Sequence, residues 1–295
     1  MMIEICEVGP RDGLQNEKKI LSTEIKAELI TKLIDAGIRN IEAVSFVNPK
    51  VVPQMADAEE LLKVLPKRED IRYGGLVLSR SGLERALNTD IHFLHVVTTT
   101  SDSFNLRNAK RTVNQAVEEL SMVIQDGVQS NKGVAGILGT AFGCPFEGEV
   151  PLGRVLTVAE KFLEAGCTEI TLADTTGMAN PSQVQTVVAA FYDRFGKDLL
   201  LGLHFHNTRG LGLANILAGY QAGVRRFDSS IGGLGGCPFA PKAVGNACTE
   251  DMVNMFHGMG IETGTDLNKL IQTAQWLEMN MGRPLDGMLM KAGIA

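Results

Sequence analysis

The stretch Leu199-Leu200-Leu201-Gly202-Leu203-His204-Phe205-His206-Asn207 predicts a buried β-strand that ends in a polar loop. An apolar run of this length is typical of a strand in a parallel sheet, which is covered on both faces. Side chains alternate along a strand, so His204 and His206 are expected on the same face. Converging neutral imidazoles can bind a metal ion, and a pair of ordinary core histidines is the alternative interpretation.

Strand-like and helix-like stretches alternate along the chain on both sides of this strand. A helix is expected to begin after Ser22 and to end at Gly37, and another to begin at Asn180-Pro181. One strand and one helix for about every 37 residues is the spacing of a (β/α)₈ barrel. The predicted strands cover residues 3–8, 40–43, 72–78, 92–97, 133–140, 169–173, 201–205 and 225–228.

One joint recurs in the sequence, in which a helix ends at a glycine just before a strand. It is found in Asp35-Ala36-Gly37-Ile38, Glu164-Ala165-Gly166-Cys167 and Gln221-Ala222-Gly223-Val224. The predicted fold is therefore an α/β TIM barrel formed by a single domain, residues 1–295. The barrel would end near residue 230, and the loop and helices of about 231–295 would cap its mouth. A doubly wound open sheet ranks lower, because no glycine-rich phosphate-binding fingerprint follows the first strand.

Composition limits the classes of partner. A net charge of −6 without a basic block argues against nucleic acid. The five cysteines are widely spaced and form no disulfide framework, which favours a reducing compartment. The first strand is expected to start at Ile3, with no room for a signal peptide, and no apolar run approaches the length of a membrane span. We expect a cytoplasmic protein with no membrane partner.

Reactive residues follow several of the predicted strands. In a TIM barrel, such residues meet at the carboxyl ends of the strands. Four of them, Asp12, His204, His206 and Asn246, offer two imidazoles and two oxygens, which suit a six-coordinate Mg²⁺ or Mn²⁺ completed by water or substrate. The alternatives are a surface ion pair for Arg11 and Asp12, and a helix cap for Asn246. The full set is Arg11, Asp12, Glu42, Ser45, Asp174, His204, His206, Cys237 and Asn246.

A glycine-rich stretch, residues 229–240, places Cys237 on a loop that can adopt positive φ angles and close over a ligand. We favour a functional thiol at this position, and a phosphate-contacting loop with an incidental cysteine is the alternative. Cys6 and Cys167 fall in strand-like runs and are expected in the core. The histidines without a partner pattern, expected to be structural or exposed, are His92, His95 and His257.

These motifs resemble the 3-hydroxy-3-methylglutaryl-CoA (HMG-CoA) lyases, which belong to a metal-dependent superfamily of TIM barrels. The likeness covers nearly the whole chain. The matching runs are residues 7–17 (EVGPRDGLQNE), 45–55, Gly143-Cys144-Pro145, Asp174-Thr175-x-Gly177 and 233–240 (GLGGCPFA).

The resemblance implies Mg²⁺ or Mn²⁺ at Asp12, His204, His206 and Asn246. It implies retro-Claisen cleavage of a 3-hydroxyacyl-CoA, above all of HMG-CoA to acetyl-CoA and acetoacetate, by a homodimer. The implied catalytic residues are Arg11, Asp12, Glu42, Asp174, His204 and Cys237. The implied substrate-binding residues are Arg11, Gln15, Ser45, Cys144, Gly235 and Gly236.

The chain departs from the family pattern at Asn207, Arg209 and Pro241-Lys242. Arg209 or Lys242 would either meet an additional carboxylate, as in citramalyl-CoA, or be solvated. A longer 3-hydroxy-3-alkylglutaryl-CoA is a further candidate substrate. The competing activities are a CoA-independent 4-hydroxy-2-oxo acid aldolase and a synthase that runs the condensation. A non-catalytic barrel that binds acyl-CoA and metal is the alternative from another class.

Overall fold

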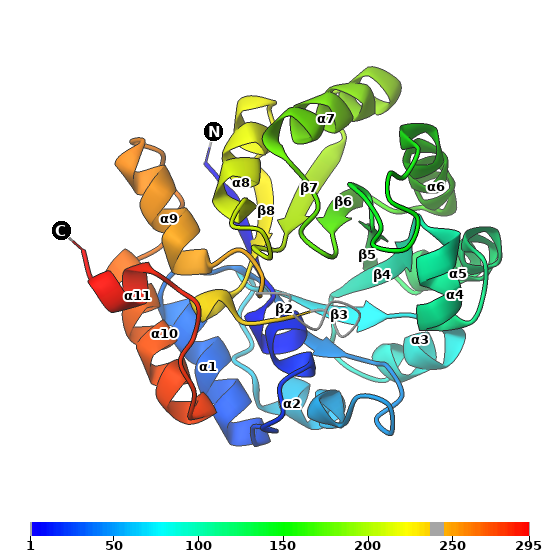
Figure 1. Cartoon of the computed structure of the whole chain (residues 1–295). Coiled ribbons are helices and arrows are strands. Elements are labelled where there is room, and N and C mark those ends of the chain that lie inside the picture. The colour runs from blue at the N-terminus through cyan, green and yellow to red at the C-terminus, as the bar shows by residue number, and fades with distance from the viewer. Residues whose placement is uncertain (1, 237–244, 295) are drawn as a thin grey trace.

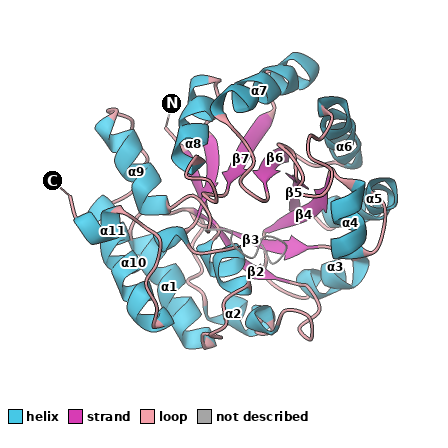
Figure 2. Ribbon diagram, viewed as in Figure 1, coloured by secondary structure: helices cyan, strands magenta, loops and turns pink. Residues whose placement is uncertain are grey.

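The computed structural model describes residues 2–236 and 245–294. Eight parallel strands surround a central axis as a barrel (Figure 2). They follow one another in sequence order, and β8 pairs with β1 to close the barrel. This confirms the predicted TIM barrel, and every strand end lies within two residues of its predicted position. The strands are β1 Glu4–Glu7, β2 Asn40–Ser45, β3 Arg72–Val77, β4 Phe93–Thr99, β5 Gly133–Gly139, β6 Glu169–Asp174, β7 Leu200–Phe205 and β8 Arg226–Ser229.

Helices surround the barrel (Figure 1). Their ends follow local sequence signals: Ser22 accepts a hydrogen bond from the amide of Ile25, and Asn180 accepts one from Gln183. The helices are α1 Thr23–Asp35, α2 Ala58–Val64, α3 Arg80–Leu87, α4 Asp102–Ala109, α5 Val113–Gln129, α6 Leu152–Ala165, α7 Pro181–Phe195, α8 Gly212–Gln221, α9 Thr249–Gly258, α10 Leu267–Met281 and α11 Leu289–Ala292. Short helical turns are η1 Gly9–Gly13, η2 Pro53–Met55 and η3 Ile231–Gly233. Within the described ranges, no helix combines the length and the apolarity that crossing a membrane requires.

The recurring glycine joint has the predicted backbone geometry. Gly37, Gly166 and Gly223 have φ angles of +98°, +114° and +107°, in the region that favours glycine over other residues. Each therefore lets the chain leave a helix of the outer layer and turn back into the next strand.

The C-terminal helices extend the outer ring. Figure 1 shows α10 against α1 and α9 next to α8, in agreement with the contacts between these elements. Both α9 and α10 also contact the turn η3. The turn η3, which also contacts η1, carries the chain over the carboxyl ends of the strands, next to these helices.

Charged side chains fill the amino-terminal end of the barrel, with Glu169 and Arg226 buried among them. Arg72 donates to one carboxylate oxygen of Glu169 at 2.6 Å, and Arg226 pairs with the other. The carboxylate of Glu4 forms ion pairs with both arginines, at 3.3 Å from Arg72 and 3.9 Å from Arg226. The guanidinium of Arg72 also lies over the Phe93 ring, 4.2 Å from its centre. The reactive residues predicted from the sequence lie at the opposite, carboxyl end of the strands.

Two buried carboxylates hold the start of the glycine-rich stretch. Glu7 accepts hydrogen bonds from the amides of Gly9 and Ile231, and Glu250 accepts one from Gly232. Burial raises the pKa of both carboxyl groups to about 7, against the lowering effect of these hydrogen bonds. The turn over the barrel mouth is therefore anchored by acids that carry their protons more readily than exposed ones.

The closure of the barrel can be tested with Glu169→Gln. The substitution removes the negative charge between two arginines, so we expect a loss of about 3–5 kcal/mol in the free energy of unfolding. Urea denaturation followed by fluorescence of the single tryptophan, Trp276, measures it. As a control, Asp90→Asn breaks an exposed ion pair with Lys67 and should cost less than about 1 kcal/mol. Equal stability of the two variants would contradict the assigned role.

The anchoring acids predict a pH dependence. The pKa of Glu250 is raised on folding from 4.5 to about 7, so the folded state binds this proton more tightly and stability falls as the pH rises through this range. Glu250→Gln should therefore gain stability relative to the wild type between pH 5 and pH 8, by on the order of 1 kcal/mol. Urea denaturation at both pH values measures the change. A stability difference that is the same at pH 5 and pH 8 would rule this out.

Candidate active site

Three of the four predicted metal ligands converge at the carboxyl end of the barrel. Asp12 comes from η1, His204 from the end of β7, and His206 from just beyond it. One ligand atom from each lies within 4.8 Å of the others. Asn246 joins them through a bridge between its backbone and that of His206, and its Nδ2 donates to Asp12 Oδ2 at 2.8 Å. Residues more than 230 positions apart thus form one cluster.

The donor atoms of this cluster fit a divalent cation. Among the described residues, His206 Nδ1 and Asn246 Oδ1 are buried and have no hydrogen-bond partner, which is uncommon for buried polar atoms. Burial and then the charge of His204 lower the pKa of His206 to about 4, so its imidazole is neutral and holds a lone pair. A carboxylate, an amide oxygen and imidazole nitrogens are ligands that Mg²⁺ and Mn²⁺ accept.

A buried aspartate orients His204. Asp228, on β8, has Oδ2 3.3 Å from His204 Nδ1. Donation from Nδ1 leaves the lone pair of this imidazole on Nε2, as in most metal-binding histidines. Burial lowers the pKa of His204, but its hydrogen bond to Asp228 and the charges of Asp228 and Asp12 outweigh this effect and raise the pKa. Asp228 was not singled out from the sequence, although strand alternation places it on the inward face with Arg226.

Arg11 lies between two carboxylates. Its Nε donates to Glu42 Oε2 at 2.6 Å and its Nη1 to Asp12 Oδ1 at 2.8 Å, while its Nη2 also pairs with Glu42. Burial raises the pKa of Asp12, but Arg11 and the two histidines outweigh it and lower the pKa to about 2. A guanidinium has five N–H donors, so one N–H on each terminal nitrogen of Arg11 is left for a substrate oxygen.

Glu42 has a second partner that the sequence did not indicate. His95, from β4, is buried, and its Nδ1 lies 2.7 Å from Glu42 Oε1. The prediction that His95 is a structural or exposed residue agrees with this burial, and only its partner was not predicted. The inward position of His95 on β4 was the available signal.

The predicted substrate-binding residues lie at different distances from the cluster. Gln15 donates to Asp12 Oδ1 at 3.3 Å, and a Cβ at Gly235 would collide with Asn246 Nδ2, so both adjoin the ligands. The carbonyl of Gly236 accepts from Asn16 at 2.6 Å. Ser45 is buried at the end of β2, where its hydroxyl accepts from the amide of Val47. Substrate contact by these residues stays a prediction.

Asp174 and Arg209 tie the adjoining loops together. Asp174 accepts from the amides of Met178 and Ala179, and burial raises its pKa to about 6. Arg209 donates to the carbonyls of Thr176 and Gly177 at 3.0 and 2.7 Å. Arg209 is thus partly engaged by the loop after β6, a role that the two interpretations of this departure did not include.

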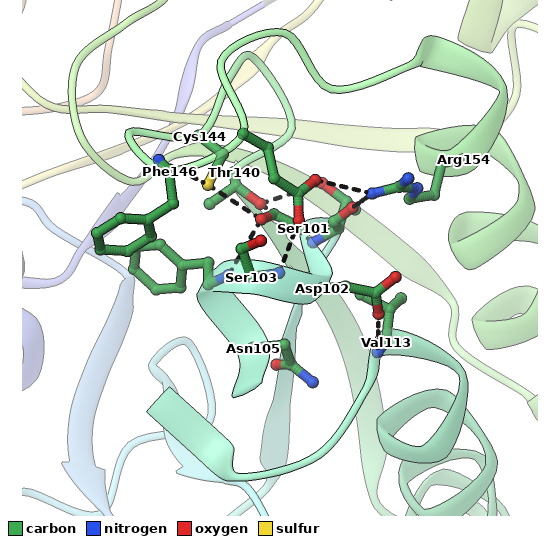
Figure 3. A network of polar contacts seen from close by, with 12 residues as sticks. Ser101, Asp102, Ser103, Asn105, Val113, Thr140, Cys144, Phe146 and Arg154 are labelled. Atoms are coloured by element: carbon green, nitrogen blue, oxygen red, sulfur yellow. Dashed lines mark hydrogen bonds and ion pairs between the residues drawn. The ribbon is translucent and has the colours of Figure 1, made fainter. Parts of the chain in front are cut away.

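Cys144 belongs to a buried network between the loops after β4 and β5 (Figure 3). The hydroxyl of Ser101 donates to its Sγ at 3.0 Å, and the amide of Phe146 donates to the same sulfur at 3.4 Å. The thiol is fully buried, so it holds these two loops together. Its predicted contact with substrate stays a prediction. Cys237 and Lys242 lie outside the described residues.

Comparisons with known proteins agree with this geometry. The HMGL-like family model matches residues 2–277. The chain is 43% identical to a protein named (R)-citramalyl-CoA lyase from Chloroflexus aurantiacus, covering 99% of this chain and 95% of the relative. It is 42% identical to the hydroxymethylglutaryl-CoA lyase YngG of Bacillus subtilis, covering 96% and 94%.

Solved structures point the same way. An HMG-CoA lyase from Acinetobacter baumannii, in complex with coenzyme A and 3-methylmalate, superimposes with a TM-score of 0.95 at 43% identity, covering 99% of this chain and 95% of that one. The HMG-CoA lyase of B. subtilis gives a TM-score of 0.95 at 41% identity, covering 99% and 97%. The chain therefore belongs to the HMG-CoA lyase family, whose members are carbon–carbon lyases.

Proposed function

We propose that this protein is a divalent-metal-dependent lyase that splits a 3-hydroxyacyl-CoA into acetyl-CoA and an oxo acid. The observation that supports it most directly is the cluster of Asp12, His204, His206 and Asn246, with two unpartnered buried ligand atoms next to Arg11. The cation would be Mg²⁺ or Mn²⁺. When bound, it would lower the pKa of the substrate hydroxyl group and orient that group.

The reaction breaks the bond between C2 and C3 of the thioester. The electrons of the O–H bond become the new carbonyl of the oxo acid, and those of the C2–C3 bond pass to the thioester enolate. Asp12 or His204, both in the cluster, takes the hydroxyl proton. The free N–H groups of Arg11 donate to the enolate oxygen, which is typically worth on the order of 3 kcal/mol for a site donor of this kind.

The enolate must be protonated at C2 before acetyl-CoA leaves. We assign this step to the Cys237 thiol, presented on the glycine-rich loop that follows η3. Closure of this loop would keep bulk water from the reacting carbons. Glu42 would act as a positioning residue for Arg11. Asp174 would act by ordering the loop after β6.

HMG-CoA is the first candidate substrate, and citramalyl-CoA is the second. The relatives with these two activities in their names are nearly equally similar to this chain, at 42% and 43% identity. The two thioesters share a tertiary hydroxyl group and a terminal carboxylate. HMG-CoA has one additional methylene between the carbon that bears the hydroxyl group and the carboxylate. A longer 3-hydroxy-3-alkylglutaryl-CoA would need more room on the same side of the site.

A product screen tests this proposal. With Mg²⁺ or Mn²⁺, we expect acetyl-CoA and acetoacetate from HMG-CoA, detected by mass spectrometry, and none after EDTA treatment. The screen includes citramalyl-CoA and a longer homologue, whose preferential cleavage would reassign the substrate. A 4-hydroxy-2-oxo acid without CoA tests for an aldolase. Tight binding of the thioesters without any cleavage would instead identify a non-catalytic barrel.

The metal site can be tested separately with Asp228→Asn. Loss of the carboxylate that orients His204 should weaken Mn²⁺ binding by about 10- to 100-fold. Titration with Mn²⁺, following the free ion by electron paramagnetic resonance, measures this without requiring turnover. Asp198→Asn is the control. Asp198 is exposed just before the amino-terminal end of β7, whereas the site is at the carboxyl ends of the strands, so the Mn²⁺ affinity should not change. An unchanged affinity in Asp228→Asn would refute the metal-orienting role.

A further inference from the structure

We propose that His95 is a positioning residue for the reaction, because it holds the far oxygen of Glu42 and thereby fixes the guanidinium of Arg11 at the site. This inference rests on the lyase activity proposed above. It assigns a role to a residue of the barrel interior that touches neither the cluster nor any group expected to react.

The contacts form a continuous chain from the barrel interior to the site. His95 Nδ1 lies 2.7 Å from Glu42 Oε1, and Glu42 Oε2 accepts from Arg11 Nε at 2.6 Å. Arg11 Nη1 then donates to Asp12 at 2.8 Å. His95 and Glu42 are 2% and 0% exposed, so water does not compete for these bonds. Each carboxylate oxygen of Glu42 thus has its own cationic or N–H partner.

The absence of a side chain at Gly74 leaves space for the imidazole ring of His95 in the barrel interior. A Cβ on Gly74 would lie 2.9 Å from two atoms of the imidazole, so a larger residue on β3 would displace the ring. The φ angle of Gly74 is not in the positive region that glycine favours, so space for His95 is the reason for glycine here. The Phe93 ring packs against the imidazole in a T-shaped arrangement, with the ring centroids 5.8 Å apart.

Electrostatics explains why a buried glutamate needs both partners. Burial raises the pKa of Glu42, and the charges of Arg11 and His95 outweigh it and lower the pKa. Without His95, one carboxylate oxygen would be buried with no donor. The carboxylate would then rotate or bind a proton, and in either case Arg11 would lose the fixed geometry that a donor to a developing oxyanion requires.

Within residues 2–236 and 245–294, His95 makes no hydrogen bond that competes with the one to Glu42. Its Nε2 is buried and has no partner among the described residues. The bond to Glu42 is therefore the polar contact that determines the orientation of the ring. This hydrogen bond could stabilise the fold alone, or it could also position Arg11 for the reaction.

Two substitutions at His95 separate these roles. His95→Leu fills the space without a donor, whereas His95→Asn keeps an N–H close to the position of Nδ1. We expect His95→Leu to lower kcat by about 10- to 100-fold, with KM and Mn²⁺ affinity within about threefold of the wild type. His95→Asn should restore kcat to within about fivefold of the wild type.

Val96→Ala is the matched control for stability. Val96 is buried on the same strand, and by alternation its side chain points to the opposite face of the sheet from His95. The control should lower the midpoint of thermal unfolding and leave kcat unchanged. Gly74→Ala should lower kcat as His95→Leu does, and the double variant should be no slower than His95→Leu alone, because both act on one ring.

The outcomes are distinct. Wild-type kcat in His95→Leu, or equal losses in His95→Leu and His95→Asn at equal thermal stability, would overturn the inference. If the wild type cleaves none of the thioesters, the proposed function fails instead. Crystal structures of the two variants test directly whether His95 positions Arg11. Displacement of Arg11 in His95→Leu but not in His95→Asn would support this role, and an unmoved Arg11 in both variants would overturn it.

Discussion

The shared ion pair of Arg11 is the interaction on which the rest of the site depends. A guanidinium buried between Asp12 and Glu42 can neutralise both carboxylates only if β1 and β2 are adjacent and in the observed register. The same contact keeps Asp12 ionised next to two imidazoles, and so keeps a negatively charged ligand available for a cation. The donor to the substrate therefore lies directly beside the candidate cation site.

The barrel interior is built to carry charge. Its amino-terminal end is filled by Arg72, Glu169 and Arg226, and the layers above hold Glu42, His95 and Asp228 instead of the branched apolar residues that usually fill a TIM barrel. Small residues on neighbouring strands, of which Gly74 is the clearest, give these polar side chains room. Because every such group needs a partner, the interior is a network of paired charges that ends at the candidate metal site.

The loops at the mouth of the barrel are also tied by specific contacts. Glu7 and Glu250 hold the turn η3, Asp174 and Arg209 hold the loop after β6, and Ser101 with Cys144 joins the loops after β4 and β5. Each contact is buried or crosses between two loops, which limits the positions that these loops can take around a ligand. Selection between two thioesters that differ by one methylene would depend on such limits.

Local sequence determined the strands, the caps at Ser22 and Asn180, the glycine joints and the common face of His204 and His206, because each depends only on neighbouring residues. It also determined the candidate ligands, since parallel strands bring their carboxyl ends together. Only the tertiary structure decided that Glu42 pairs with His95, that Asp228 orients His204 and that Arg209 donates to loop carbonyls. These partners are 53, 24 and 32 or 33 residues apart. The first two pairings depend on the register between strands and the third on how two loops meet, and no local pattern encodes either.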